Sequence, residues 1–120
     1  RQLFRAAGEG HVIAATLDNI DHSATQVEAT LFGQTVGLAR WAVKIAARRQ
    51  LPVVPCYFSS DGNLHRVQVG TPILPEQAET AVQHYADFFT QHILADPASW
   101  AYLVDKRWRR ILSQARATGV

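Results

Sequence analysis

The stretch LARWAVKIAARRQLPVVPCYF, residues 38–58, decides the fold class because it changes from one apolar pattern to another. In residues 38–49 the apolar positions recur at helical spacing, which predicts an amphipathic helix. Residues 51–58 form a short apolar run, which is typical of a strand buried on both faces of a parallel sheet. A helix that leads directly into such a strand favours an α/β fold, in which crossover helices join parallel strands.

The apolar run before this stretch has the same character. HVIAATLD, residues 11–18, predicts a second buried strand, and the helix over 38–49 would connect the two strands as parallel neighbours. The pattern of residues 1–10 indicates the end of a helix, with two glycines as stop signals. Residues 19–35 show no clear period, so we expect a long loop there.

Beyond residue 58 the sequence predicts a hairpin and two further helices. The turn sequence SSDGN, residues 59–63, joins residues 51–58 to the alternating run 64–70, which predicts a strand hairpin at one edge of the sheet. A helix that begins with proline is predicted over residues 75–94. A last helix is predicted over residues 98–115.

The predicted architecture is a single α/β domain over residues 1–120. It has a small, mostly parallel sheet with an edge hairpin, helices packed on the sheet, and C-terminal helices. We expect an exposed sheet edge, which favours self-association. Because the chain opens at Arg1 in a helical pattern and lacks an initiating Met, we also expect it to be a fragment of a longer protein.

Composition excludes several classes of protein. With 48% apolar residues the chain can bury an ordinary core, while a net charge of +2 and a pI near 9.0 are too weak to indicate nucleic-acid binding. The single cysteine, Cys56, excludes an internal disulfide or a cysteine-based zinc site, and we expect it in the core. No apolar run approaches the roughly 18 residues needed to cross a bilayer, so we expect any membrane contact of this chain to be peripheral.

Several motifs, taken in order, carry a family resemblance. They are Asp18 after the first apolar run, Phe32 and Gly33 before the helix, PVVP at residues 52–55, and Pro97, Trp100, Arg107 and Trp108 near the end. In this order the sequence resembles the C-terminal half of the bacterial lipid A late acyltransferases. These are the lauroyl and myristoyl transferases related to the lysophospholipid acyltransferases. The resemblance covers almost the whole chain and implies part of a glycerolipid-acyltransferase-like fold. The sequence departs from the family at Trp41, which stands where the family usually has a turn.

The resemblance implies a function and a place in the cell. Such enzymes transfer a fatty acyl chain from an acyl carrier protein or coenzyme A thioester to a lipid hydroxyl, in the synthesis of lipid A and lipopolysaccharide. They act in association with the membrane, at the cytoplasmic face of the bacterial inner membrane.

The resemblance also implies a catalytic motif, a His followed after four residues by Asp or Glu, with the His as general base on the acceptor hydroxyl. None of the five histidines here has an acid five positions on. We therefore expect the parent protein to be an acyltransferase, its catalytic motif to lie before Arg1, and this chain alone to be inactive.

Two groups of residues are candidates for binding the substrate or the carrier protein. Asp18 ends a predicted buried strand, where a carboxylate can accept a substrate hydroxyl or orient a catalytic group, or instead cap a turn. Arg40, Lys44 and Arg48 recur at every fourth position, so they form a continuous basic stripe on the predicted helix. We expect this stripe to bind phosphate groups or the acidic face of an acyl carrier protein. The alternative is a solvated helix face.

The C-terminal sequence KRWRR, residues 106–110, is a candidate for membrane binding. It joins Trp108 to the four cations Lys106, Arg107, Arg109 and Arg110. This combination suits the headgroup layer of an anionic membrane. The alternative is a solvated helix end with Trp108 in the core.

No pattern in the sequence points to a metal or a cofactor, and we expect neither, because the histidines lack ligand partners at useful spacing. The alternative to an enzyme fragment is a non-catalytic α/β binding module for an anionic lipid or a carrier protein. Nucleic-acid binding ranks last, because no aromatic platform, glycine loop or helix-turn-helix accompanies the cations.

Overall fold

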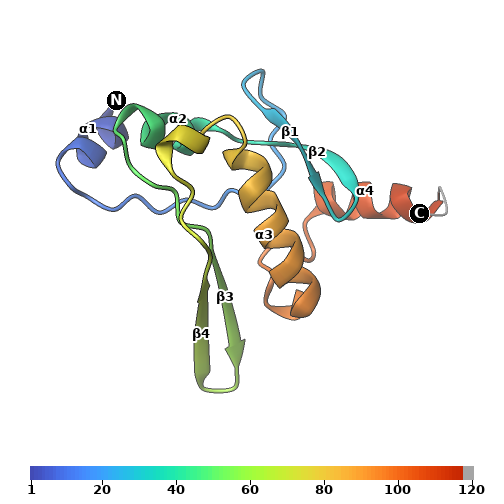
Figure 1. Ribbon diagram of the computed structural model, residues 1–120. Coiled ribbons are helices and arrows are strands. Elements are labelled where there is room, and N and C mark those ends of the chain that lie inside the picture. The colour runs from blue at the N-terminus through green and yellow to red at the C-terminus, as the bar shows by residue number, and fades with distance from the viewer. Residues whose placement is uncertain (118–120) are drawn as a thin grey trace.

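The computed structural model describes residues 1–117, with side chains described as far as residue 114. This part of the chain holds four α-helices, two 3-10 helices and two antiparallel sheets of two strands each. In order they are α1 (Gln2–Gly8), β1 (Val27–Leu31), β2 (Gln34–Leu38), α2 (Trp41–Arg48), β3 (Cys56–Asp61), β4 (Leu64–Val69), η1 (Pro75–Gln77), α3 (Ala81–Ala95), η2 (Pro97–Ser99) and α4 (Lys106–Ala117). Figure 1 shows α3 running between the two hairpins.

The fold is mixed α/β as predicted, but the predicted parallel sheet is wrong. Residues 11–18 are extended and belong to no strand, and Val12 is 96% exposed. Residues 51–55 join the rest through an antiparallel bridge between Val53 and Ile73. An apolar run becomes a sheet strand only where a neighbouring backbone pairs with it, and the described residues place none beside 11–18.

Residues 27–38, most of which were expected in a long loop, form the β1–β2 hairpin. The two strands pair antiparallel, and the turn residues Phe32 and Gly33 have φ angles of 53° and 71°. Positive φ at both central positions gives the turn the twist that a two-residue hairpin needs. Leu31 and Leu38 are fully buried on one face of this hairpin. Leu38 therefore ends a strand, and the predicted helix begins only at Trp41.

The predicted strand hairpin is confirmed as β3–β4, although it forms a sheet of its own and not the edge of a larger one. Cys56 pairs with Val69 and Asp61 with Leu64, which leaves a two-residue turn where Gly62 has a φ of 59°. The hairpin projects away from the other elements (Figure 1). Every residue of β4 is exposed.

The predicted helices are confirmed in outline, with different extents. The helix predicted over 75–94 is the 3-10 turn η1 followed by α3, and the one predicted over 98–115 is η2 followed by α4. Asp105 explains why α4 begins where it does. Its carboxylate accepts hydrogen bonds from the backbone N–H groups of Arg107 (2.9 Å) and Trp108 (3.2 Å), as a helix cap does. These hydrogen bonds lower the pKa of Asp105.

The core lies where α3 and the C-terminal turns meet the β1–β2 hairpin. The Gln83 side chain of α3 accepts a hydrogen bond from the Thr30 N–H (2.9 Å) and donates one to the Thr30 carbonyl (3.0 Å). It therefore satisfies backbone groups on the free edge of β1. Phe32, Trp100 and Trp108 pack edge to face, with ring centroids 5.3 to 5.5 Å apart. This aromatic cluster fixes the turn of the hairpin against the C-terminal elements.

Candidate functional site

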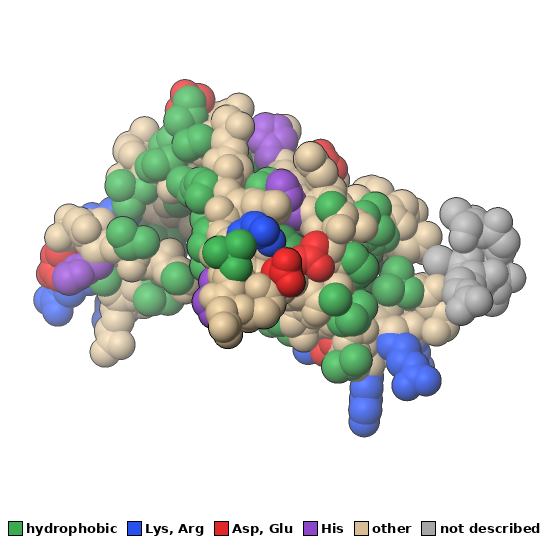
Figure 2. All heavy atoms as spheres, turned by 90° about the horizontal axis from the view of Figure 1, so that it is seen from below, with side chains coloured by type: hydrophobic (Ala, Val, Ile, Leu, Met, Phe, Trp, Pro, Cys, Tyr) green, Lys and Arg blue, Asp and Glu red, His purple; other side chains and the backbone are tan. Residues whose placement is uncertain are grey.

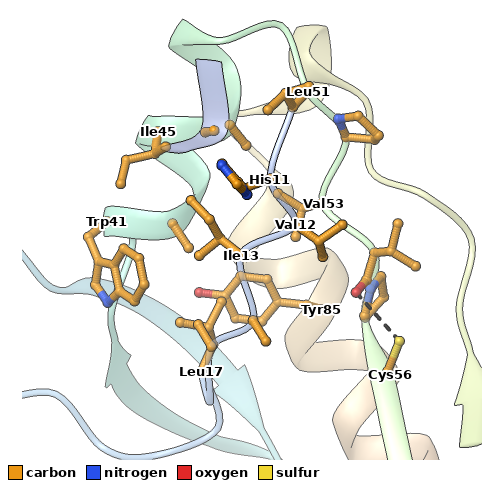
Figure 3. Close-up of a pocket in the computed structure, with 18 of the residues that line it drawn as sticks. His11, Val12, Ile13, Leu17, Trp41, Ile45, Leu51, Val53, Cys56 and Tyr85 are labelled. Atoms are coloured by element: carbon orange, nitrogen blue, oxygen red, sulfur yellow. Dashed lines mark hydrogen bonds between the residues drawn. The ribbon is translucent and has the colours of Figure 1, made fainter. Parts of the chain in front are cut away.

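A cavity of about 590 Å³ opens between the end of α1, helices α2 and α3, the start of β3 and the two extended segments at residues 10–17 and 51–55. Figure 3 shows Trp41 and Ile45 of α2 on one side and Val53 and Cys56 on the other, with Ile13 between them. The volume falls within the range of small-molecule sites, about 300–1,000 Å³. We call this space the apolar cavity, because its walls are mainly aliphatic and aromatic side chains.

Few polar groups reach the apolar cavity. Tyr85 of α3 is buried and donates its hydroxyl hydrogen bond to the Ala39 carbonyl at 2.6 Å, and burial raises the pKa of Tyr85. His11 also lines the cavity, with Nε2 3.8 Å from a carboxylate oxygen of the exposed Glu9. Cys56, expected in the core, is half-buried in the cavity wall. No Asp, Glu, Lys or Arg is among the described residues that line it.

Helix α2 presents one face to the apolar cavity and a basic stripe to solvent. Its cavity face consists of Trp41, Ala42, Ile45 and Ala46. The predicted basic stripe consists of Arg40, Lys44 and Arg48, which we call the α2 cations, and all three are exposed. None of them makes an ion pair within residues 1–114. The next cation, Arg49, is occupied: its Nε donates to the Phe4 carbonyl at 2.9 Å, and its guanidinium lies 3.7 Å from the centre of the Phe4 ring.

Asp18 lies outside the lining of the apolar cavity and ties the chain to its C-terminal elements. Its carboxylate accepts a hydrogen bond from the Trp100 indole (2.8 Å), and its backbone carbonyl accepts one from the Trp108 indole (2.9 Å). Burial raises the pKa of Asp18, and the hydrogen bond from Trp100 partly opposes that shift. Asp18 is therefore a structural anchor, and its predicted role toward the substrate stays a prediction.

The C-terminal candidate residues divide into a buried and an exposed set. Trp108 is fully buried, so its indole lies in the core and not at the surface. The predicted cations Lys106, Arg107, Arg109 and Arg110, which we call the tail cations, are exposed. Arg107 donates to the Ile20 carbonyl at 3.1 Å. Figure 2 shows basic side chains projecting beside the C-terminal end. Leu103 and Val104, which no sequence pattern marked as candidates, are 50% and 85% exposed just before these cations.

The other histidines do not build a reactive centre around the cavity. His65 Nδ1 lies 2.8 Å from the Ser60 hydroxyl on the β3–β4 hairpin, and the His92 ring packs at a tilt against Phe88. Neither histidine lines the apolar cavity. No group of three His, Cys, Asp or Glu side chains that could hold a metal ion occurs in the described part of the chain.

The sequence matches the model of a known protein family over most of its length. Residues 1–110 match the model of the family described as bacterial lipid A biosynthesis acyltransferase. The chain belongs to this family. Membership of the lipid A acyltransferases implies acyl thioester and lipid substrates. No curated protein matches the sequence. None of the described helices of this lipid A acyltransferase chain is long and apolar enough to span a membrane.

Proposed function

We propose that this chain is the acyl-binding part of a lipid A acyltransferase. The enzyme transfers a fatty acyl chain from an acyl carrier protein or coenzyme A thioester to a hydroxyl of a lipid A precursor. The apolar cavity carries the proposal, because its uncharged walls complement a hydrocarbon chain. Each buried methylene contributes about 0.8 kcal/mol, so about ten of them supply roughly 8 kcal/mol before the cost of ordering the chain.

The transfer also needs a general base. The base takes the proton from the acceptor hydroxyl as its oxygen attacks the thioester carbonyl, and the carrier leaves as its thiol. No His in this sequence is followed five positions later by Asp or Glu, which is the spacing expected for the family. We therefore assign the base to another part of the protein, and residues 1–120 to the C-terminal part of its acyltransferase domain.

We further propose that the protein works at the cytoplasmic face of the bacterial inner membrane, attached through its tail cations. Lys106, Arg109 and Arg110 are exposed and make no ion pair within residues 1–114. Leu103 and Val104 give the same region exposed apolar surface. Cations beside apolar side chains suit the boundary between anionic head groups and hydrocarbon.

A cavity-filling variant tests whether the apolar cavity binds the acyl chain. Ala46 lines the cavity, so Ala46→Phe should fill part of it and weaken binding of a fluorescent fatty acid. Ala101→Phe is the matched control, because Ala101 is exposed and lies outside the cavity lining. If Ala46→Phe binds the fatty acid as tightly as the parent chain while remaining folded, the cavity is not the acyl site.

An activity assay tests the assignment of the base. The isolated chain, given an acyl carrier protein thioester and a lipid A precursor, should bind the acyl chain without transferring it, because no His in this sequence has the expected spacing to an acid. Release of the carrier thiol is the measured quantity, with and without the acceptor. Acceptor-dependent release by this chain alone would place the base among these 120 residues and contradict the assignment.

A further inference from the structure

One stripe of α2 combines an aromatic ring, contact with the apolar cavity and two cations. The stripe begins at Trp41 and continues through Lys44, Ile45 and Arg48, which come three, four and seven positions later. This spacing places the four residues along one side of the helix. Trp41 and Ile45 line the cavity, whereas Lys44 and Arg48 are exposed. The two cations therefore border the apolar wall directly.

The charges at this border are available to an anion from outside. Neither Lys44 nor Arg48 makes an ion pair with any side chain that the structure describes, and the cavity lining adds no acidic residue. Trp41 is 40% exposed and lies on the opposite side of the cavity from Cys56 (Figure 3). A ligand in the cavity would therefore pass from hydrocarbon contacts to positive charge on the Trp41 side.

We propose that Trp41, Lys44 and Arg48 bind the phosphate head of a single-chain amphiphile whose hydrocarbon chain occupies the apolar cavity. This rests on the proposed function, which fills the cavity with an acyl chain, and it adds a site for phosphate at the Trp41 side of the cavity. Lys and Arg donate charge-assisted hydrogen bonds to phosphate oxygens. Trp suits the boundary between the two parts, because its indole has an apolar body and a polar N–H.

The arrangement fits an individual amphiphile better than a bilayer surface. Trp41 and Ile45 line a hollow whose other walls come from α1, α3, β3 and two extended segments. Such a hollow takes one chain out of water, whereas a bilayer presents a broad surface to exposed side chains. The tail cations, by contrast, lie on α4 and belong to no described part of the cavity lining.

Tryptophan fluorescence can report on this site. Trp100 and Trp108 are buried, so the half-exposed Trp41 is the ring whose emission and acrylamide quenching a ligand should change. The probes are dodecyl phosphate, dodecyl maltoside with the same chain and a neutral head, and inorganic phosphate without a chain. Both detergents are used below their micelle concentrations. A Trp41→Phe variant identifies the part of the signal that comes from Trp41.

We expect dodecyl phosphate to bind on the order of tenfold more tightly than dodecyl maltoside at low salt. Inorganic phosphate alone should leave the emission unchanged, and added salt should reduce the preference. The double variant Lys44→Gln with Arg48→Gln should bind both detergents equally. Its matched control, Lys106→Gln with Arg109→Gln, removes the same charge from α4 and should keep the preference.

Two results would overturn the inference. If the parent chain binds both detergents equally, or if the preference survives in the Lys44 and Arg48 double variant, the stripe does not hold a phosphate head, although the acyl cavity stands. If neither detergent changes the Trp41 signal, the cavity binds no chain and the proposed function fails with it. Thermal unfolding checks each variant, and if the double variant does not fold, the salt dependence of the parent chain decides.

Discussion

Replacing Asp18 tests whether its carboxylate serves the fold through its charge or through its hydrogen bond. The carboxylate accepts the indole N–H of Trp100 at 2.8 Å, and Trp100 is buried. Asp18→Ala leaves that N–H without its partner, and a buried unsatisfied donor costs about 1–3 kcal/mol. Asp18→Asn keeps an acceptor oxygen and removes the charge that is unfavourable to bury. We therefore expect the alanine variant to lose about 1–3 kcal/mol of unfolding free energy and the asparagine variant clearly less.

The pH dependence of the unfolding free energy is a second test of the role of Asp18. Burial raises the pKa of Asp18, so the folded chain holds this proton more tightly than the unfolded chain does. The resulting stability is fully present below the ordinary carboxyl pKa and is lost as the pH rises through the raised folded value. Asparagine does not titrate. The stability of Asp18→Asn relative to the parent chain should therefore increase with pH across that window and stay constant above it.

Urea denaturation followed by tryptophan fluorescence measures these free energies over a series of pH values. A loss of 1–3 kcal/mol should also lower the unfolding temperature, by about 4 °C for each kcal/mol in a chain of this size. Asp61→Ala, at an exposed position of the β3–β4 hairpin, is the control and should change stability by less than about 0.5 kcal/mol. The reasoning is refuted if Asp18→Asn destabilises as much as Asp18→Ala, or if their difference from the parent chain does not depend on pH.

Three further changes have expected outcomes. Gly37→Ala should lower the unfolding temperature, because a Cβ there would lie 2.6 Å from the Asp21 carbonyl oxygen, and an unchanged melting curve would contradict that close approach. Tyr85→Phe should cost about 1–3 kcal/mol in urea denaturation, because the Ala39 carbonyl loses its buried donor; a cost near zero would show that water replaces the hydroxyl. Replacing all four tail cations with Gln should abolish sedimentation with anionic vesicles at low salt without unfolding the chain, and 1 M salt should mimic it. Undiminished binding by that variant would show that the tail is a solvated helix end.

Local patterns in the sequence predicted the elements that form because of their own residues. The turn sequence at Gly62 predicted the β3–β4 hairpin, and apolar spacing predicted α2 and α3. The β1–β2 hairpin was missed although its signal was present, since Val27, Ala29 and Leu31 alternate before the Phe32 turn. The parallel sheet was wrong for a different reason. An apolar run shows that a segment needs partners, but its pattern does not say which backbone supplies them.

In the candidate site, too, the sequence predicted what depends on neighbouring residues and missed what depends on distant ones. The spacing correctly placed Lys44 and Arg48 on one exposed side of a helix, because that depends only on helical geometry, whereas Arg40 is exposed just before α2 begins. The role of Asp18 in the fold depends on indoles 82 and 90 positions away, and no local pattern carries that information. The cavity is likewise non-local, because its walls come from four separate parts of the sequence.

The bonds between Asp18 and the two indoles also set an order of events during translation. Ninety positions separate Asp18 from Trp108, so at roughly 5–20 residues per second a ribosome needs on the order of ten seconds to supply the second indole. During that interval the apolar segment 11–17 has left the ribosome without the contacts that later hold Asp18 in place. A nascent chain in this state exposes apolar surface to which chaperones that bind extended apolar peptides can attach. A chain whose synthesis stops before residue 100 lacks both indoles and therefore cannot form the hydrogen bonds that hold Asp18.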